Sequence, residues 1–476
     1  MKTLASLLVF CSFLAEAQTW QTGPYCPVQA GTMHLLRDGR VFVYEEGSTE
    51  PPAILTPDRM GSYLNGTWTS AAPLPNGYAP HSYSSAVLPD GRLIFEGAEY
   101  NNGIQDWSPL GAIYDPVANT WTSVNPPTGW NTIGDAPSVV LPNGTFMQAN
   151  CCTYQTALLN AKNLTWSPGG RVLTVNNNEE GWALLPNGKV LVVNSSFACG
   201  SNVSTALYDP ATNVWTCDAP LPMQLWGKDQ ELGSTLVMDN GKAIQFGGAV
   251  SATAVLDLAS DTWSLGPQPP GGYGQDDGPS VLEPNGKVLA MLGINTDKSC
   301  QFVEYDPAAN TLSLAPNPVE CPDQGYDSVS GRLLQLPTGQ IFFSLASHRP
   351  EIFTPSAGVV QNAAPYIYSA ALRLYPGSAN NILFGRQLNG LSCGAGYGDD
   401  VQMCTNYPIV KLVDPFGRVW FARTHDDSYS GIAPGTVSYT KFDLPTMPLG
   451  QYNMTVVTNG ISSNIVSVIV ALSNQE

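Results

Sequence analysis

The fold of this chain is decided by the stretch Ser84-Ser85-Ala86-Val87-Leu88-Pro89-Asp90-Gly91-Arg92-Leu93-Ile94-Phe95. Two short runs of strand-forming residues flank an Asp-Gly pair in this stretch. Asp-Gly and Asn-Gly supply the positive backbone angles that a two-residue hairpin turn requires. Runs of this length and composition are typical of β-strands, so the stretch predicts a β-hairpin.

The same pattern recurs along the chain, with turns roughly 45 to 55 residues apart, which is the spacing of propeller blades. The turns are 36–39, 88–91, 141–144, 185–188, 238–241, 283–286 and 336–339. A second turn pattern follows most hairpins, as in Tyr114-Asp115-Pro116 with Trp121. Four strands per unit in seven units predict an all-β, seven-bladed kelch-type β-propeller. The segment near Trp20 is expected to close the last blade.

After about residue 365 this pattern stops, and short apolar runs alternate with turns, as in 409–413 and 452–457. About 100 residues with such a pattern are typical of an immunoglobulin-like β-sandwich. We therefore expect a signal peptide at 1–17, the propeller at 18–364 and a C-terminal sandwich at 365–476.

Residues 1–17 have the pattern of a secretory signal, with Lys2, an apolar run over 4–14, and Ala15-Glu16-Ala17 as a cleavage site. The apolar run is too short to span a bilayer, so the protein is predicted to be secreted and to make no contact with a membrane. We also expect it to be a monomer. The net charge of −18 argues against nucleic acid as a partner. Six sequons would suit glycosylation in a eukaryotic host: Asn65, Asn143, Asn163, Asn194, Asn202 and Asn453.

Export makes disulfides the expected state of the cysteines. The chain holds 10 cysteines, one of them Cys11 in the signal segment, which leaves nine. Closeness in sequence suggests three pairs: Cys199 with Cys217, Cys300 with Cys321, and Cys393 with Cys404. Cys151 and Cys152 could bridge each other, or one of them could pair with Cys26, and the odd count leaves one thiol over. His34 lies in an apolar run and is expected in the core.

A kelch propeller followed by such a sandwich resembles the galactose oxidase and glyoxal oxidase family over nearly all of the mature chain. The resemblance implies a copper site with an axial Tyr, a Tyr-His pair, a Tyr cross-linked to a Cys, and a C-terminal His. Tyr326-Asp327-Ser328 keeps a Tyr but has Asp in place of His, and Thr424-His425-Asp426 offers the C-terminal His. Tyr78-Ala79-Pro80-His81 lacks the Cys, and Gly134-Asp135-Ala136 lacks the cross-linked Tyr. Copper-radical chemistry is therefore not expected.

Alignment of the hairpins shows a different pattern, an acidic residue just before the first strand of several blades. These residues are Asp135, Glu179 (with Glu180 beside it), Glu231, Asp277 and Asp327, and His81 takes the place in the second blade. The first strands of a propeller surround its axis, so we expect these side chains to meet at one mouth of the central channel. Carboxylates gathered there must shift their pKa values or bind a cation.

Three interpretations stay open. The first is a Ca²⁺ site, with candidate metal ligands Asp135, Glu231, Asp277, Asp327 and His425. The second is acid/base catalysis by the same mouth residues, including Glu179, with His81 and Tyr326 assisting, in glycan hydrolysis or lyase-type proton abstraction. The third is structural, each acid capping backbone N–H groups. We expect a protein that binds or processes an extracellular saccharide, a hydrolase or lyase in preference to a copper-radical oxidase. The alternatives are a non-catalytic lectin or adhesion module and a divergent copper-dependent alcohol or aldehyde oxidase.

Overall fold

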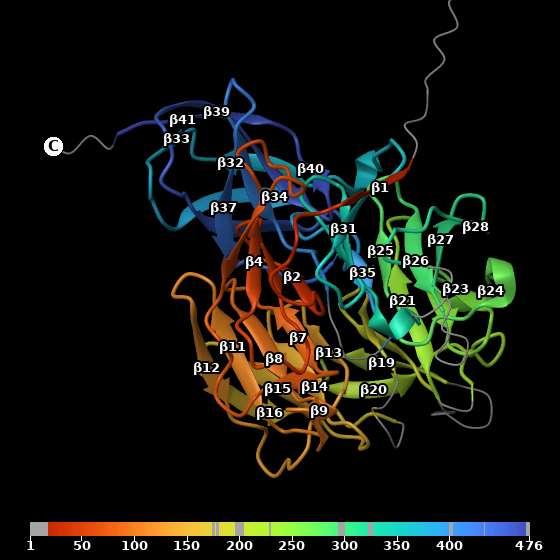
Figure 1. Ribbon diagram of the computed structural model, residues 1–476. Helices are drawn as coiled ribbons and strands as arrows, with labels where there is room; N and C mark the ends of the chain where they lie inside the picture. The colour runs from red at the N-terminus through yellow and green to blue at the C-terminus, as the bar shows by residue number, and fades with distance from the viewer. Residues whose placement is uncertain are drawn as a thin grey trace, which may run out of the picture.

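The computed structural model describes residues 18–173, 177, 180–195, 204–227, 230–293, 300–321, 327–398, 403–432 and 434–472. In these residues, six four-stranded sheets and one five-stranded sheet form the blades of a propeller, and a nine-stranded sheet forms a sandwich beyond it (Figure 1). The predicted fold class, a seven-bladed propeller followed by a β-sandwich, is confirmed.

The first blade contains β2 (Met33–Leu35), β3 (Val41–Val43), β4 (Ala53–Thr56) and β5 (Thr67–Ser70). The second contains β7 (Ser84–Val87), β8 (Leu93–Glu96), β11 (Gly111–Asp115) and β12 (Thr120–Val124), with a small added sheet of β6 (Pro80–His81), β9 (Tyr100–Asn101) and β10 (Ile104–Gln105). The third contains β13 (Ser138–Val140), β14 (Phe146–Ala149), β15 (Thr156–Asn160) and β16 (Thr165–Pro168). The fourth contains β17 (Trp182–Leu184), β18 (Val190–Val193), β19 (Thr205–Asp209) and β20 (Val214–Cys217).

The fifth blade contains β21 (Leu232–Val237), β22 (Lys242–Gly247), β23 (Thr253–Asp257) and β24 (Thr262–Leu265). The sixth contains β25 (Ser280–Leu282), β26 (Val288–Leu292), β27 (Gln301–Asp306) and β28 (Thr311–Leu314), and the seventh contains β29 (Arg332–Gln335), β30 (Ile341–Ser344), β31 (Glu351–Thr354) and β1 (Thr19–Thr22). The sandwich contains β32 (Tyr366–Ala370), β33 (Arg373–Leu374), β34 (Asn381–Arg386), β36 (Ile409–Val413), β37 (Val419–His425), β38 (Val437–Asp443), β39 (Gly450–Thr458), β40 (Ile461–Ser462) and β41 (Val466–Val470). Short 3-10 turns are η1 (Pro270–Gly272), η2 (Ser328–Ser330) and η3 (Gln361–Ala363).

The N-terminal strand closes the propeller, as predicted for the segment near Trp20. β1 pairs antiparallel with β31 and becomes the outermost strand of the seventh blade. The Trp20 ring lies 4.8 Å from Phe353 and 5.2 Å from Phe302, ring centre to ring centre. These contacts hold the first residues of the fold against the sixth and seventh blades.

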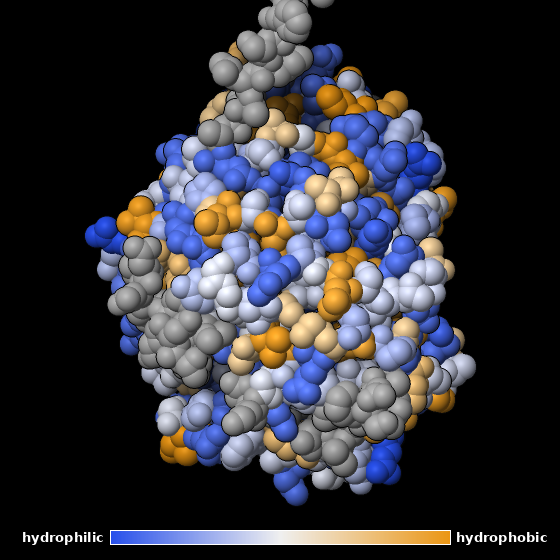
Figure 2. Space-filling view, turned by 90° about the vertical axis from the view of Figure 1, so that its right-hand side faces the viewer, coloured by the Kyte–Doolittle hydropathy of each residue, from blue (hydrophilic) through white to orange (hydrophobic). Residues whose placement is uncertain are grey.

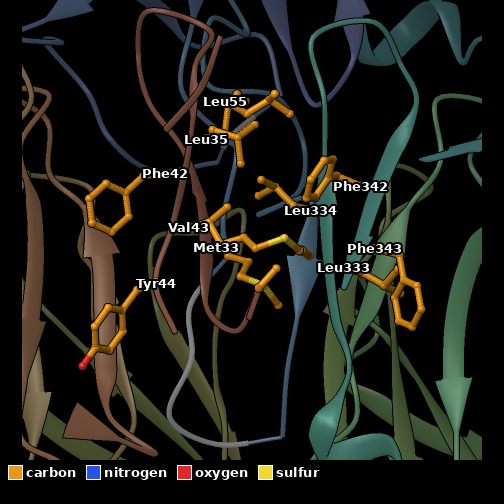
Figure 3. Packing of buried hydrophobic residues seen from close by; sticks show 14 of the residues in the cluster. Met33, Leu35, Phe42, Val43, Tyr44, Leu55, Leu333, Leu334, Phe342 and Phe343 are labelled. Atoms are coloured by element: carbon orange, nitrogen blue, oxygen red, sulfur yellow. The ribbon is translucent and has the colours of Figure 1, made fainter. Parts of the chain in front are cut away.

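The core lies between neighbouring blades, where each sheet packs its apolar side chains on the next. Figure 3 shows this at the junction of the first and seventh blades, where Met33 and Leu35 lie opposite Leu333 and Leu334. All four are almost completely buried. His34 is also buried and its Nε2 lies 3.0 Å from the Ser85 hydroxyl, so the expectation of a core histidine is confirmed. Burial lowers the pKa of His34 to about 3.

The sandwich docks on the end of the propeller that carries the predicted Asp-Gly and Asn-Gly turns, which we call the turn end. The backbone N–H of Asp426 donates to Pro89 O (2.9 Å), and that of Ser430 donates to Pro142 O (2.9 Å). In Figure 1 the sandwich lies at the top, and β9 marks the opposite end of the propeller at the bottom.

One segment of the sandwich sequence, residues 389–398, leaves that domain and enters the central channel. Its strand β35 (Ala395–Gly396) pairs with β25 and makes the sixth blade five-stranded. Beyond β35, a Cβ atom on Gly398 would lie 2.3 Å from Asp277 Oδ1. The segment, which we call the channel segment, therefore reaches the far end of the channel. The Cys393–Cys404 disulfide closes it.

Two of the three predicted disulfides, Cys300–Cys321 and Cys393–Cys404, are confirmed. Cys217 is disulfide-bonded, and its predicted partner Cys199 lies outside the described residues. Cys26 is a buried thiol whose pKa burial raises to about 12. The face in Figure 2 mixes hydrophilic and hydrophobic residues, with the apolar ones scattered in small groups. Among the residues described, none of the helices has the length and apolar character needed to cross a bilayer.

Candidate functional site

The end of the propeller opposite the sandwich is where the first strand of each blade begins, and we call it the axial mouth. Because the strands of a blade alternate in direction, the loops that join second and third strands open at the same end. Two sets of residues therefore meet at the axial mouth. One precedes the first strands, as predicted, and the other follows the second strands.

Asp135, Glu99 and Glu231 form an electrostatically linked group from three different blades. Asp135 precedes β13, Glu99 follows β8 and Glu231 precedes β21. The pKa of Asp135 is raised to about 6, first by burial and in addition by the negative charges of Glu99 and Glu231. The Oε2 atom of Glu231 is buried and accepts no hydrogen bond from the described residues. The prediction that acids distant in sequence share one environment is supported for this pair, Asp135 and Glu231.

The thiol of Cys151, in the loop between β14 and β15, hydrogen-bonds to the Asp135 carboxylate and opposes the rise in its pKa. The backbone N–H of Cys151 donates to Ile133 O at 2.7 Å. A Cβ atom on Gly134 would lie only 2.7 Å from Cys151 Cβ, so glycine is required where the two loops cross. Asp135 is therefore held in place by its own blade.

A buried ion pair lies in the same region and was not predicted. Arg332 Nη2 lies 2.9 Å from Glu46 Oε1, and both side chains are nearly inaccessible to solvent. Arg332 Nη1 donates to the Tyr397 hydroxyl (3.0 Å), and its guanidinium lies 4.3 Å from that ring's centre. Burial opposes ionisation of Glu46, but Arg332 and His81 outweigh it and hold its pKa below the ordinary value. This network joins the first and seventh blades to the channel segment.

The other predicted residues are placed as follows. Asp277 is buried, has the uncommon positive φ of 43°, and contacts the channel segment at Gly398. Asp327 is buried, and its Oδ1 accepts from the Ser330 hydroxyl (2.9 Å). Its side chain does not cap the backbone N–H groups of η2, so the structural interpretation is not confirmed for this acid. His81 is exposed at the mouth, and its ring lies 5.9 Å from Tyr100. Glu179 and Tyr326 lie outside the described residues.

His425 does not join this group, and its assignment as a metal ligand with the mouth acids is corrected. It ends β37 in the sandwich, where its Nε2 lies 3.1 Å from Asp443 Oδ1. Asp426, the next residue, bonds to the turn residue Pro89. The four-residue strand β7 spans about 13 Å at roughly 3.3 Å per residue, so His425 and the mouth lie at opposite ends of the blades.

No three His, Cys, Asp or Glu side chains in the described ranges are grouped so that they could hold a metal ion. The described members of the predicted Ca²⁺ set are therefore not brought together as a metal site. The residues also do not fit the copper site that the resemblance implies, because Asp135 and Asp327 stand where that site needs Tyr and His. Imidazole suits copper better than carboxylate does.

Sequence reasoning missed Glu46, Glu99, Cys151 and Arg332. The first three follow second strands, whereas the alignment considered only residues before first strands. The antiparallel order of each blade was a usable signal for them. Arg332 begins β29, and nothing in the hairpin pattern distinguishes it from a surface arginine.

At the level of sequence, no family model matches the chain and no curated protein matches it. Solved structures do resemble it. A fungal alcohol oxidase of the AA5 family, in complex with copper, has a TM-score of 0.54 at 13% identity over 95% of this chain and 99% of that chain. A catalytically inactive virginiamycin B lyase from Staphylococcus aureus with quinupristin has 0.51 at 8%, over 71% and 99%. A streptogramin B lyase has 0.50 at 12%, over 71% and 97%. These likenesses show the fold alone.

Proposed function

We propose that this protein is a secreted, monomeric propeller enzyme that cleaves an extracellular, uncharged saccharide by acid/base chemistry at the axial mouth. The observation that carries the proposal is the pKa of Asp135, about 6, in the company of Glu99 and Glu231. A carboxylic acid that keeps its proton up to about pH 6 beside other carboxylates has the properties of a general acid.

In this proposal Asp135 donates its proton to the glycosidic oxygen that leaves. Glu231, whose Oε2 accepts no hydrogen bond within the described residues, acts as the base that takes a proton from the attacking water, or as the nucleophile whose bond to the sugar is then cleaved by water. Cys151 holds the Asp135 carboxylate through its thiol and is a positioning residue. Such a pair of carboxyl groups supports hydrolysis, or elimination if Glu231 removes a carbon-bound proton. The −18 charge of the chain favours an uncharged substrate over an acidic one.

The test is a product screen with neutral oligosaccharides, which compares the native protein with Asp135→Asn and Glu231→Gln. Loss of a positioned acid or base typically lowers the rate by roughly 10² to 10⁴-fold. Because Asp135 must be protonated, activity should fall as the pH rises through about 6. Full activity in Asp135→Asn would remove the assignment. Binding of a glycan without any product would favour the lectin alternative.

A further inference from the structure

The sandwich carries a second candidate binding site, far from the axial mouth. Three neighbouring strands of the sandwich sheet, β32, β34 and β38, present a row of aromatic side chains, three of them exposed and one half-buried. Tyr366 and Tyr368 come from β32, Phe384 from β34 and Tyr439 from β38, and we call these four residues the aromatic face. Tyr368 is 53% exposed and Phe384 is 46% exposed. Rings of this size are usually packed away, so their grouping on one face requires an explanation.

The rings are arranged by the strand register. Phe384 is the cross-strand partner of Tyr439, and their ring centres lie 5.7 Å apart. Tyr366 and Tyr368 lie 5.3 Å apart, and the Arg386 guanidinium lies 5.6 Å from the centre of the Tyr366 ring. Rings on neighbouring strands of one sheet face are held by the backbone, so the surface exists before any ligand arrives.

The aromatic face leads into a polar cleft between the sandwich and the second and third blades. Tyr439 belongs to both, because it also lines a hollow of about 460 Å³ together with Asp90, Asn143, Lys162, Asp426 and Lys441. This volume is in the range of roughly 300 to 1,000 Å³ found for small-ligand sites. The cleft therefore has room for a few sugar rings.

The charges of the cleft are almost completely compensated by their neighbours. Arg92 lies 2.7 Å from Asp90, Lys441 lies 3.2 Å from Asp426, and Arg37 lies 2.6 Å from the third lining acid, Asp427. Lys162 is the one lining cation with no ion pair among the described residues. A site of balanced charge on a chain of net charge −18 complements an uncharged ligand rich in hydroxyl groups. Exposed aromatic rings beside fixed polar groups match the apolar ring faces and polar rim of a sugar.

We propose that Phe384, Tyr439 and the adjoining cleft bind a neutral oligosaccharide, independently of the axial mouth. The sugar ring faces pack on the two aromatic side chains, and the hydroxyl groups bond to the polar residues of the cleft. The site lies at the turn end, so it can hold one part of a long chain while leaving the mouth free.

The test is calorimetric titration of the full protein with cellohexaose, xylohexaose, mannohexaose and chitohexaose, with a galacturonic acid hexamer as the acidic probe. The protein should come from a host without N-glycosylation, because Asn143 is both a cleft residue and the start of a sequon. We expect a neutral hexasaccharide to bind, and Phe384→Ala and Tyr439→Ala each to weaken binding by roughly tenfold. Phe416→Ala, which removes an equally apolar ring that is 79% exposed elsewhere on the sandwich, should change nothing.

Failure of every neutral probe to bind, binding of the acidic probe alone, or unchanged binding in both aromatic variants would overturn the proposal. A dimer that dissociates in Phe384→Ala would also overturn it, by making the aromatic face a contact between copies. The outcome is separable from that of the proposed enzyme. Asp135→Asn should leave this binding intact, whereas Phe384→Ala should leave turnover of a short soluble substrate intact.

Discussion

The two ends of the propeller differ in how their acids are compensated. At the turn end, acids of the sandwich and the turns meet cations directly, as in Arg37 with Asp427 and Arg423 with Asp443. At the axial mouth, Glu46 is paired with Arg332, but Asp135 has the acids Glu99 and Glu231 for neighbours and its pKa is raised. Paired charges stabilise the contact between the two domains, whereas an acid surrounded by other acids has a raised pKa and can donate a proton. The difference separates a structural interface from a candidate site.

The largest expected effect is at the turn end. Asp427→Asn leaves the buried Arg37 guanidinium without its countercharge, and breaking such a pair costs about 3–5 kcal/mol. Urea unfolding would measure the loss. Asp38→Asn is the control, because its ion pair with Arg40 is partly exposed and such pairs contribute less than about 1 kcal/mol. Equal losses in the two variants would contradict the contrast between buried and exposed pairs.

A second prediction concerns Glu96, a buried acid at the mouth end of β8 whose carboxylate oxygens accept no hydrogen bond from the described residues. Burial raises its pKa well above the ordinary value. An acid with a raised pKa in the folded state stabilises the fold less as the pH rises above its unfolded pKa. Glu96→Gln should therefore become more stable relative to the native protein by up to about 1.4 kcal/mol per pH unit above roughly pH 4.5.

Unfolding free energies of both proteins between pH 4 and 8 would test this. A constant difference across that range would show that the pKa of Glu96 is the same in the folded and unfolded states, against the prediction.

A third prediction tests how the channel segment packs against Asp277 at the mouth. Gly398→Ala places a Cβ atom 2.4 Å from Asp277 Cα. The backbone must move to relieve this overlap. Overpacking of this kind costs roughly 1–3 kcal/mol. Unfolding experiments should show that loss, together with altered chemical shifts at Asp277. A variant as stable as the native protein would mean that the channel segment does not pack against Asp277 in this way.

The smallest effect concerns the acidic group itself. Glu99→Gln removes one of the charges that raise the pKa of Asp135, so the pKa of Asp135 should fall. Carboxyl-carbon NMR titration of labelled protein would measure it. Glu50→Gln is the matched control, because Glu50 is exposed and its charge is not among those that raise the pKa of Asp135. If both variants titrate like the native protein, the charge of Glu99 does not contribute to the raised pKa of Asp135.

Much of the architecture could be predicted because it depends on interactions between residues close together in the sequence. Each Asn-Gly or Asp-Gly pair marks a turn, but only the glycine takes a positive φ, as Gly91 does with 87°. The backbone N–H of Leu88 donates to Arg92 O, so the loop has three residues and the predicted two-residue turn is corrected. Repetition of that turn fixes the blade count, and the alternation of strands fixes which residues precede the first strand. Asp135 and Glu231 could be found in this way, because their position in the repeat is a local property.

The remaining features depend on contacts between segments far apart in the sequence. The Arg332–Glu46 pair joins residues 286 positions apart, and the channel segment brings Gly398 to Asp277. His425 was misplaced because its position in the sequence does not reveal which end of the propeller the sandwich covers. The sequence by itself determined the turns, the strands and the repeat, because hairpin geometry and alternating burial act over a few residues. Only the tertiary structure decided which charges meet, because electrostatic neighbours and burial are set by how blades and sandwich pack together.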